Sequence, residues 1–132
     1  MVARARELNP PEMHFVQGSM LEIGVADKRL AGIVSFYAVI HVERGLVPVV
    51  LQEFYRVLKK DGTVLVAVHG GEGESRFEEA FGVKVPYTAT LFNADELRGY
   101  FEDAGFEKVE VMEREPLDFE MQTKRIYVFA TK

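Results

Sequence analysis

The sequence predicts a three-layer α/β domain with a mostly parallel sheet of about five strands and a C-terminal antiparallel hairpin. Two apolar runs, residues 31–40 and 63–68, do not alternate with polar residues, which is typical of strands buried on both faces. Segments with helical spacing follow both runs, and two further β-rich segments close the chain. This order along the chain is the one that a sheet with crossover helices requires.

The N-terminal region predicts a short helix and a short strand. Residues 2–8 fit the last turns of a helix, because the Asn-Pro-Pro sequence at 9–11 cannot continue it. Residues 13–17 (MHFVQ) fit a short strand that ends at Gly18. A polar stretch follows and leaves room for about one helical turn before the strand at 31–40.

The central region predicts a helix followed by a buried strand. Residues 46–59 carry apolar side chains at intervals of three and four, and Pro48 falls in the first turn, where proline is tolerated. We expect Asp61 and Gly62 to end this helix. Residues 63–68 (TVLVAV) then form the next strand.

Ser75 and Glu78 have the spacing of a capping box, which predicts a short helix that ends at Gly82. Residues 85–92 are expected to be extended.

The C-terminal region predicts a helix and a hairpin. Asn93 is placed as an N-cap with Glu96 at the reciprocal position, and Gly105 as the stop. Residues 106–112 and 125–131 are predicted to pair as an antiparallel hairpin.

Composition favours one domain over residues 1–132 and excludes several classes of protein. Apolar residues make up 48% of the chain, which is enough for a core. No apolar run reaches the roughly 20 residues of a membrane span, and no secretory signal is recognisable. The absence of cysteine excludes disulfides and thiolate metal sites and agrees with a cytoplasmic location. The net charge of -5 with dispersed basic residues argues against nucleic-acid binding.

Four segments, taken in order, resemble the C-terminal part of the class I S-adenosylmethionine-dependent methyltransferases of the small-molecule type. They are FVQGSM at 15–20, IVSFYAVIH at 33–41, RVLKKDGTVL at 56–65, and the EL…AGF segment at 96–106. The resemblance covers essentially the whole chain. It implies a truncated Rossmann-like methyltransferase fold, methyltransferase activity and S-adenosylmethionine as the cofactor.

The resemblance also implies where the cofactor would lie. The positions that match its contacts in the family are Gly18, Ser19, Met20, Ser35, Phe36, Tyr37 and His41. Ser19 stands where the family usually has an acidic residue, and no segment matches the family's glycine-rich turn. We therefore expect the isolated chain to lack methyltransferase activity; the catalytic residues and the methyl acceptor are not identified.

Two histidines are predicted to meet at one edge of the sheet. His41 and His69 each follow a strand, and the carboxyl edge of an α/β sheet is where ligands bind. The alternative is that His41 is satisfied by a backbone carbonyl or by Glu43, and that Tyr37 belongs to the core. His41, His69 and Glu72 could together form a metal site, but their spacing matches no strong metal motif, and no metal is expected.

In the intact fold, further strands separate 13–17 from 31–40, so the resemblance predicts a bare edge at strand 31–40. We expect strand 13–17 to swing across to it, or a second copy to cover it in a homodimer through strand 31–40 or by exchange of the N-terminal segment. Three hypotheses remain: activity restored in an oligomer or with another chain, a non-catalytic dimeric binding or assembly module, and a domain separated from its other half.

Overall fold

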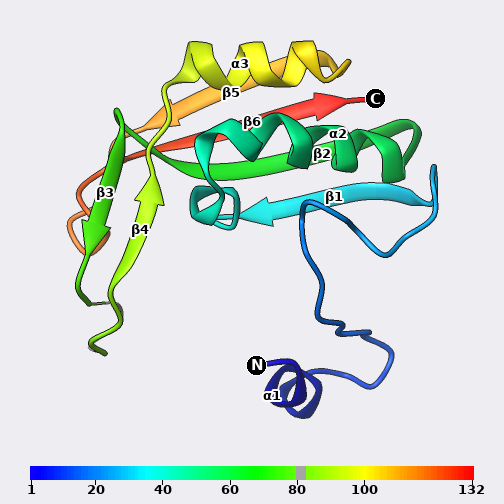
Figure 1. Ribbon diagram of the computed structural model, residues 1–132, viewed down its shortest axis with the longest axis horizontal. Coiled ribbons are helices and arrows are strands. Elements are labelled where there is room, and N and C mark those ends of the chain that lie inside the picture. Colours follow the sequence, from blue (N-terminus) through cyan, green and yellow to red (C-terminus); the bar gives the residue numbers. More distant parts are fainter. Residues whose placement is uncertain (80–82) are drawn as a thin grey trace.

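The computed structural model describes residues 1–79 and 83–132, and its centre is a mixed four-stranded sheet (Figure 1). The order across the sheet is β1 (Leu30–Phe36), β2 (Leu58–Gly70), β6 (Lys124–Thr131) and β5 (Glu107–Arg114). β1 and β2 run parallel, whereas the β2–β6 and β6–β5 pairs are antiparallel. The α/β class and the C-terminal antiparallel hairpin are thereby confirmed. Over the described residues, the sheet itself is mixed and has four strands with one parallel pair, in place of the predicted mostly parallel sheet of about five strands.

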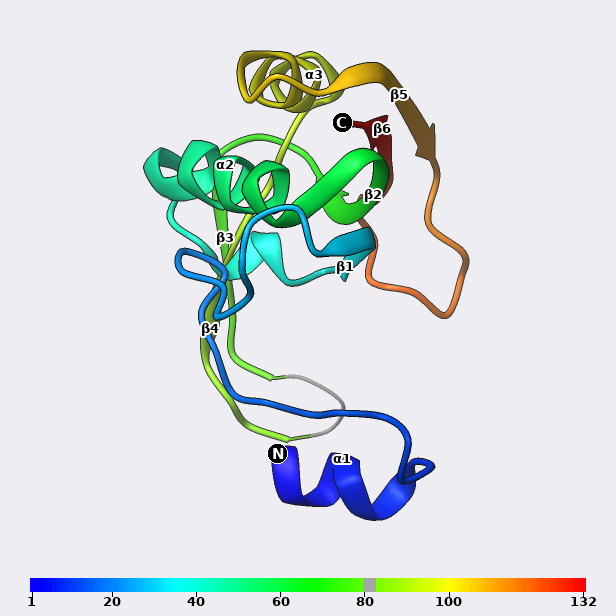
Figure 2. The ribbon, with the colours of Figure 1, turned by 90° about the vertical axis from the view of Figure 1, so that its right-hand side faces the viewer.

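Two helices cover one face of this sheet. α2 (Val47–Val57) and α3 (Ala94–Asp103) lie side by side on it, as Figure 2 shows when the sheet is seen from its end. Their apolar stripes supply much of the core, together with alternate residues of β2 and β6. The fully buried helix residues are Val47, Val50, Leu51, Val57, Leu97 and Phe101.

The opposite face of the sheet carries no helix among the described residues. Strand alternation places a set of mostly apolar side chains there, in two cross-strand rows. The rows are Val34, Leu65 and Phe129, and Phe36, Ala67, Tyr127 and Met112. Val34 is 68% exposed and Met112 60% exposed. We call this surface the open face; in the described part of the chain it takes the place of the expected third layer.

The predicted helix and strand in the centre are present with shifted bounds. α2 ends at Val57, and β2 begins at Leu58 rather than after Gly62. Asp61 has φ 62° and lies at an irregularity in the pairing of β1 with β2. The Asp-Gly pair thus bends a strand instead of ending the helix, because both residue types tolerate a left-handed conformation.

The strand predicted at 31–40 is shorter than expected. β1 stops at Phe36, and Tyr37 takes φ 49°, which turns the chain out of the sheet. A 3-10 helix, η1 (Val39–His41), follows and is joined to α2 by a second one, η2 (Arg44–Leu46). Val39 and Ile40 therefore enter the core from a turn and not from a strand.

The prediction of a helix that begins at Ser75 is wrong. Residues Glu74–Phe77 form strand β3, which pairs antiparallel with β4 (Tyr87–Thr90) in a separate two-stranded sheet. The predicted end of that helix, Gly82, lies outside the described residues. Ser75 pairs with Ala89, so long-range strand pairing overrides the local capping pattern here.

The C-terminal helix is confirmed with one change. Asn93 Oδ1 accepts a hydrogen bond of 2.8 Å from the Glu96 backbone N–H, and Gly105 follows the helix with φ 96°. The Glu96 carboxylate does not return to Asn93; it accepts from the Arg44 guanidinium and from the Tyr100 hydroxyl. The reciprocal half of the predicted capping box is thus replaced by a link to η2.

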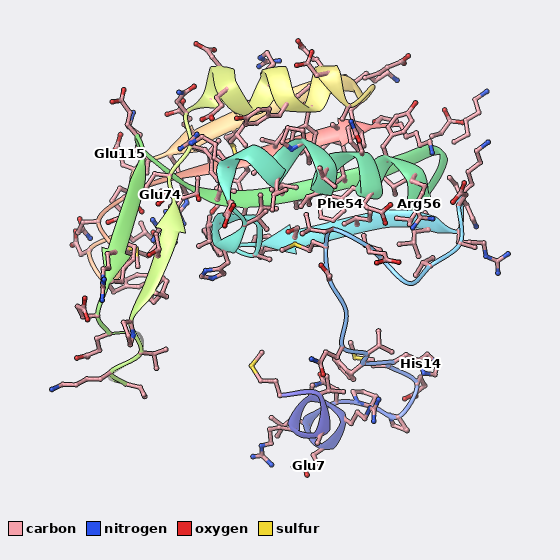
Figure 3. The ribbon with its side chains drawn as sticks, viewed as in Figure 1. Glu7, His14, Phe54, Arg56, Glu74 and Glu115 are labelled. Carbon is pink, nitrogen blue, oxygen red and sulfur yellow. The ribbon has the colours of Figure 1, made fainter. Side chains whose placement is uncertain are left out.

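The predicted strand at 13–17 is absent. Residues 1–19 instead form an extension, which we call the arm. α1 (Val2–Leu8) has no buried side chain, and residues 14–18 are irregular. Figures 1 and 2 show α1 standing away from the sheet, and Figure 3 places Glu7 and His14 in this arm. The expected pairing of 13–17 with strand 31–40 therefore does not occur within the chain.

The arm is joined to the body at a polar clamp on α2. The Arg56 guanidinium donates to the carbonyls of Ile23 and Val25 and to the Asp27 carboxylate. Glu53 accepts two hydrogen bonds from Arg56 and one of 2.9 Å from the Ile23 N–H. Residues 23–27 are therefore fixed, and Met20 packs against the core, whereas residues 1–19 include no buried side chain. None of the described helices has the length and hydropathy needed to cross a membrane.

Candidate functional site

A cavity of about 770 Å³ opens at the carboxyl ends of the parallel strands β1 and β2. Its walls come from η1, from the β3–β4 hairpin and from the loop that joins β5 to β6. The lining residues are Tyr37, Ile40, His41, His69, Glu79, Val85, Tyr87, Phe119, Glu120, Met121 and Arg125. A cavity of this size at this edge is where α/β sheets bind small molecules.

Two rings from the neighbouring strand ends stack on each other in the cavity. The centroids of Tyr37 and His69 are 4.8 Å apart and their planes are inclined by 27°. His69 lies near the end of β2 and is buried, and its Nδ1 is 2.8 Å from Thr123 Oγ1. The left-handed turn at Tyr37 brings its ring against this imidazole.

Arg125 occupies the strand position next to His69. The two residues are paired in register between β2 and β6, and Arg125 is only 4% exposed. Its Nη1 donates to the Thr123 carbonyl (2.6 Å) and to Thr123 Oγ1 (2.8 Å). The guanidinium carbon lies 5.8 Å from the centroid of the Tyr37 ring, in cation–π range.

This environment keeps both stacked rings uncharged near neutral pH. Burial lowers the pKa of His69, and its electrostatic interactions with Arg125 and His41 lower it further. Burial and the neighbouring Tyr127 raise the pKa of Tyr37. A neutral imidazole can accept a proton from a bound molecule, which is the commonest form of general-base chemistry.

The structure brings together Tyr37 and His41 of the seven residues predicted for cofactor contact. Both line the cavity, with the His41 ring edge-on to Tyr87 at 5.7 Å. His41 and His69 line the same cavity at this edge.

The other five predicted residues do not line this cavity. Gly18 and Ser19 are exposed at the end of the arm, where Ser19 Oγ accepts from the Leu21 N–H. Met20 is half-buried against the core. Ser35 is buried, with an Oγ that has no hydrogen-bond partner among the described residues, and Phe36 lies half-exposed on the open face.

Sequence reasoning missed the residues that come from the second half of the chain. Tyr87, Phe119, Met121 and Arg125 reach the cavity only through the β3–β4 pairing and the folding back of the β5–β6 loop. One signal was present: Arg125 is a charged residue at the start of an otherwise apolar strand.

Glu120, which also lines the cavity, pairs with Arg114 through two hydrogen bonds of 2.7 Å.

Comparison with known proteins identifies the class to which this architecture corresponds. A family model described as a methyltransferase domain matches residues 1–62. Comparison with curated proteins finds no match. The fold is that of the S-adenosylmethionine-dependent methyltransferases, and the resemblance expected from the four sequence segments is confirmed.

Three similar solved structures illustrate the match. A methyltransferase from Methanosarcina mazei has 15% identity and TM-score 0.74, over 87% of this chain and 65% of its own. A Burkholderia thailandensis 1,6-didemethyltoxoflavin-N1-methyltransferase, solved with S-adenosylhomocysteine, has 17% identity and TM-score 0.72, over 98% and 55%. A complex of the Haloferax volcanii Trm112 methyltransferase activator with a putative methyltransferase has 20% identity and TM-score 0.75, over 99% and 66%. The chain thus spans about half to two thirds of the length of these structures.

The described residues do not by themselves fit S-adenosylmethionine, the cofactor that this fold implies. Its adenosine and amino-acid parts need several polar contacts that converge on one cavity. Here Ser19 is exposed in the arm, and Ser35 Oγ, which has no partner among the described residues, does not line the cavity. The described part of the chain also holds no group of three His, Asp or Glu side chains that could bind a metal ion.

Proposed function

We propose that this chain binds a small-molecule methyl acceptor in the cavity at the ends of β1 and β2, and takes part in S-adenosylmethionine-dependent methyl transfer once a second polypeptide completes the cofactor site. The observation that carries the proposal is the cavity itself, at the carboxyl edge of the parallel strand pair of a methyltransferase fold. Position and size both suit an organic molecule of low molecular mass.

The side chains around the cavity have distinct roles in this proposal. Tyr37, Tyr87 and Phe119 present aromatic surface to the body of the acceptor. Buried His69, held at Nδ1 by Thr123, is the group placed to take a proton from the acceptor. Exposed His41 lies at the mouth of the cavity beside Tyr87.

The cofactor contacts belong to the completed site. We propose that Gly18, Ser19 and Met20 together with Ser35, Phe36, Tyr37 and His41 face the cofactor when the second polypeptide is bound. The unpartnered Ser35 Oγ and the exposed ring of Phe36 support this, because both have contacts to gain. One similar structure is a methyltransferase in complex with an activator protein, which agrees with a site that needs a second component.

We propose that the second polypeptide is another copy of this chain. β1 is an edge strand next to the apolar open face, and both would be costly to leave in water. The arm carries no buried side chain in its own chain and projects away from it (Figure 2). Exchange of the arm between two copies would cover both surfaces at once.

Calorimetric titration of the purified protein with S-adenosylmethionine and S-adenosylhomocysteine, beside light scattering for mass, tests the proposal. Dissociation constants below about 100 μM in a dimer would support it. A monodisperse monomer at tens of micromolar, or no heat from the ligands at about millimolar concentration, would contradict it.

The alternative function is a non-catalytic dimeric binding or assembly module. The open face favours it, because an apolar sheet surface can serve an interface without any cofactor. A dimer of the expected mass that binds neither ligand would establish this alternative over the first.

A further inference from the structure

The charge of Arg125 has no counter-ion in the described part of the chain. Its exposed fraction is 4%, and its hydrogen bonds go to the carbonyl and hydroxyl of Thr123, which are neutral. No carboxylate of residues 1–79 or 83–132 lies within ion-pair distance of the guanidinium. The residues outside those ranges, Ala80, Phe81 and Gly82, have no charged side chains.

The described acidic residues around the cavity form no ion pair with Arg125, although its positive charge is among the influences that lower the pKa of Glu120. Glu120 is engaged by Arg114 through both carboxylate oxygens, at 2.7 Å each, and accepts 2.8 Å from the Leu117 N–H. Glu79 lies exposed at the rim. A buried cation without a partner is costly, and one that lines a cavity is a candidate for a functional site.

The chemistry around Arg125 defines what could supply the missing charge. Guanidinium has a planar set of donors that matches the oxygens of a carboxylate or a phosphate, and only its Nη1 is used within the chain. The ring of Tyr37 lies beside it, and Tyr87 and Phe119 line the same cavity. His69 adds no second positive charge near neutral pH, since burial and Arg125 lower its pKa.

We infer that the cavity is specific for small organic oxyanions, and that Arg125 binds their carboxylate or phosphate group while the aromatic walls hold an apolar body. The inference rests on the proposed function in that it names the class of methyl acceptor. It makes Arg125 the residue that determines substrate charge, and Tyr37 the residue that positions the guanidinium from the side.

The first experiment compares ligands that differ in charge. Benzoate, phenyl phosphate and the neutral benzamide are titrated into the full chain at constant ionic strength, with backbone amide chemical shifts as the readout. We expect both anions to shift the amides of Tyr37, His69 and Arg125, with benzoate binding about tenfold or more tightly than benzamide. Equal binding of benzoate and benzamide, or anion shifts confined to the exposed Lys59 and Lys60, would overturn the inference.

The second experiment changes the arginine. Arg125→Met should remove the preference for benzoate, whereas Arg98→Met, on α3 outside the cavity, should leave it unchanged. Arg125→Lys keeps the charge without the planar fork and serves if the Met variant does not fold. It should bind benzoate more weakly than the native chain and still prefer it to benzamide. Undiminished benzoate affinity in a folded Met or Lys variant would contradict the role of Arg125.

The two proposals fail separately in these measurements. Benzoate binding at Arg125 without any cofactor binding would remove the methyl-transfer function and leave an oxyanion-binding module. Cofactor binding with no preference for anions would keep methyl transfer and remove the oxyanion specificity.

Discussion

The imidazole of His69 lies against the phenol ring of Tyr37, with centroids 4.8 Å apart, and this stack joins the ends of two parallel strands. Tyr37 directly follows β1, and His69 is the penultimate residue of β2. The stack closes one side of the cavity and lies beside the buried charge of Arg125. The protonation state of His69 therefore affects both the packing of these strand ends and one wall of the cavity.

The first prediction concerns the pH dependence of stability. Burial, and then the charge of Arg125, lower the pKa of His69 below its usual 6.5, so the unfolded chain takes up the proton first as the pH falls. The free energy of unfolding should decrease as the pH drops below 6.5 and level off below the folded-state pKa. Urea unfolding of His69→Gln should show a shallower slope in this range, whereas His14→Gln, in the exposed arm, should not. Identical slopes for native and His69→Gln proteins would contradict the prediction.

The second prediction concerns the clamp between α2 and residues 23–27. Hydrogen bonds from Arg56 and from the Ile23 N–H lower the pKa of Glu53 from 4.5 to about 2. The stabilisation is therefore complete above pH 4.5 and is lost as the pH falls towards about 2. Glu53→Gln should cost about 1 kcal/mol at neutral pH, because a charged acceptor becomes neutral at a partly exposed site.

The control for the clamp is Glu102→Gln, at an exposed position of α3. Its stability should match that of the native chain at both neutral and acid pH. The difference between native and Glu53→Gln proteins should shrink in acid. A pH-independent difference would assign the effect to packing instead of charge.

The third prediction tests the open face as an interface between copies. Val34→Lys places a charge on the open face at its β1 edge and should convert a dimer into a monomer, measured by light scattering across a dilution series. Val49→Lys is the matched control, because Val49 is an exposed valine on α2. Loss of the dimer in both variants, or in neither, would place the interface elsewhere.

The fourth prediction compares two phenylalanines on opposite sides of the sheet. Phe101 is fully buried, and its ring centroid lies 5.3 Å from that of Phe106. Phe101→Ala should therefore lower the free energy of unfolding by about 3–5 kcal/mol. Phe36 is 51% exposed, and Phe36→Ala should cost less than about 1 kcal/mol in a monomer. In a dimer, the cost of Phe36→Ala should grow with protein concentration in thermal unfolding, because the interface is then part of the folded state.

Elements with strong local patterns were predictable from the sequence. The apolar spacing of α2 and the cap at Asn93 define their helices without reference to the rest of the chain. The buried run at 63–68 likewise lies within β2. In each case the local pattern and the tertiary packing favour the same structure.

Elements that depend on distant partners were not predictable. Residues 13–17 have strand-like composition, but a strand needs a neighbour for its backbone groups, and none is paired with them in the described chain. Ser75 and Glu78 imitate a helix start, whereas β4 is available as a strand partner. The site was half-predictable for the same reason. Tyr37, His41 and His69 lie at or shortly after the carboxyl ends of β1 and β2, where the sequence predicted a site. Arg125 and the β5–β6 loop reach the cavity only through the tertiary fold.

The strand order has a consequence for synthesis of the protein. β6 follows β5 in the chain yet lies between β2 and β5, so β2 leaves the ribosome long before its antiparallel partner exists. Roughly 50 residues separate the two strands, which corresponds to several seconds at ordinary translation rates. During that interval the nascent chain presents one unpaired edge of the longest described strand, and such an edge can pair with other chains until β6 emerges.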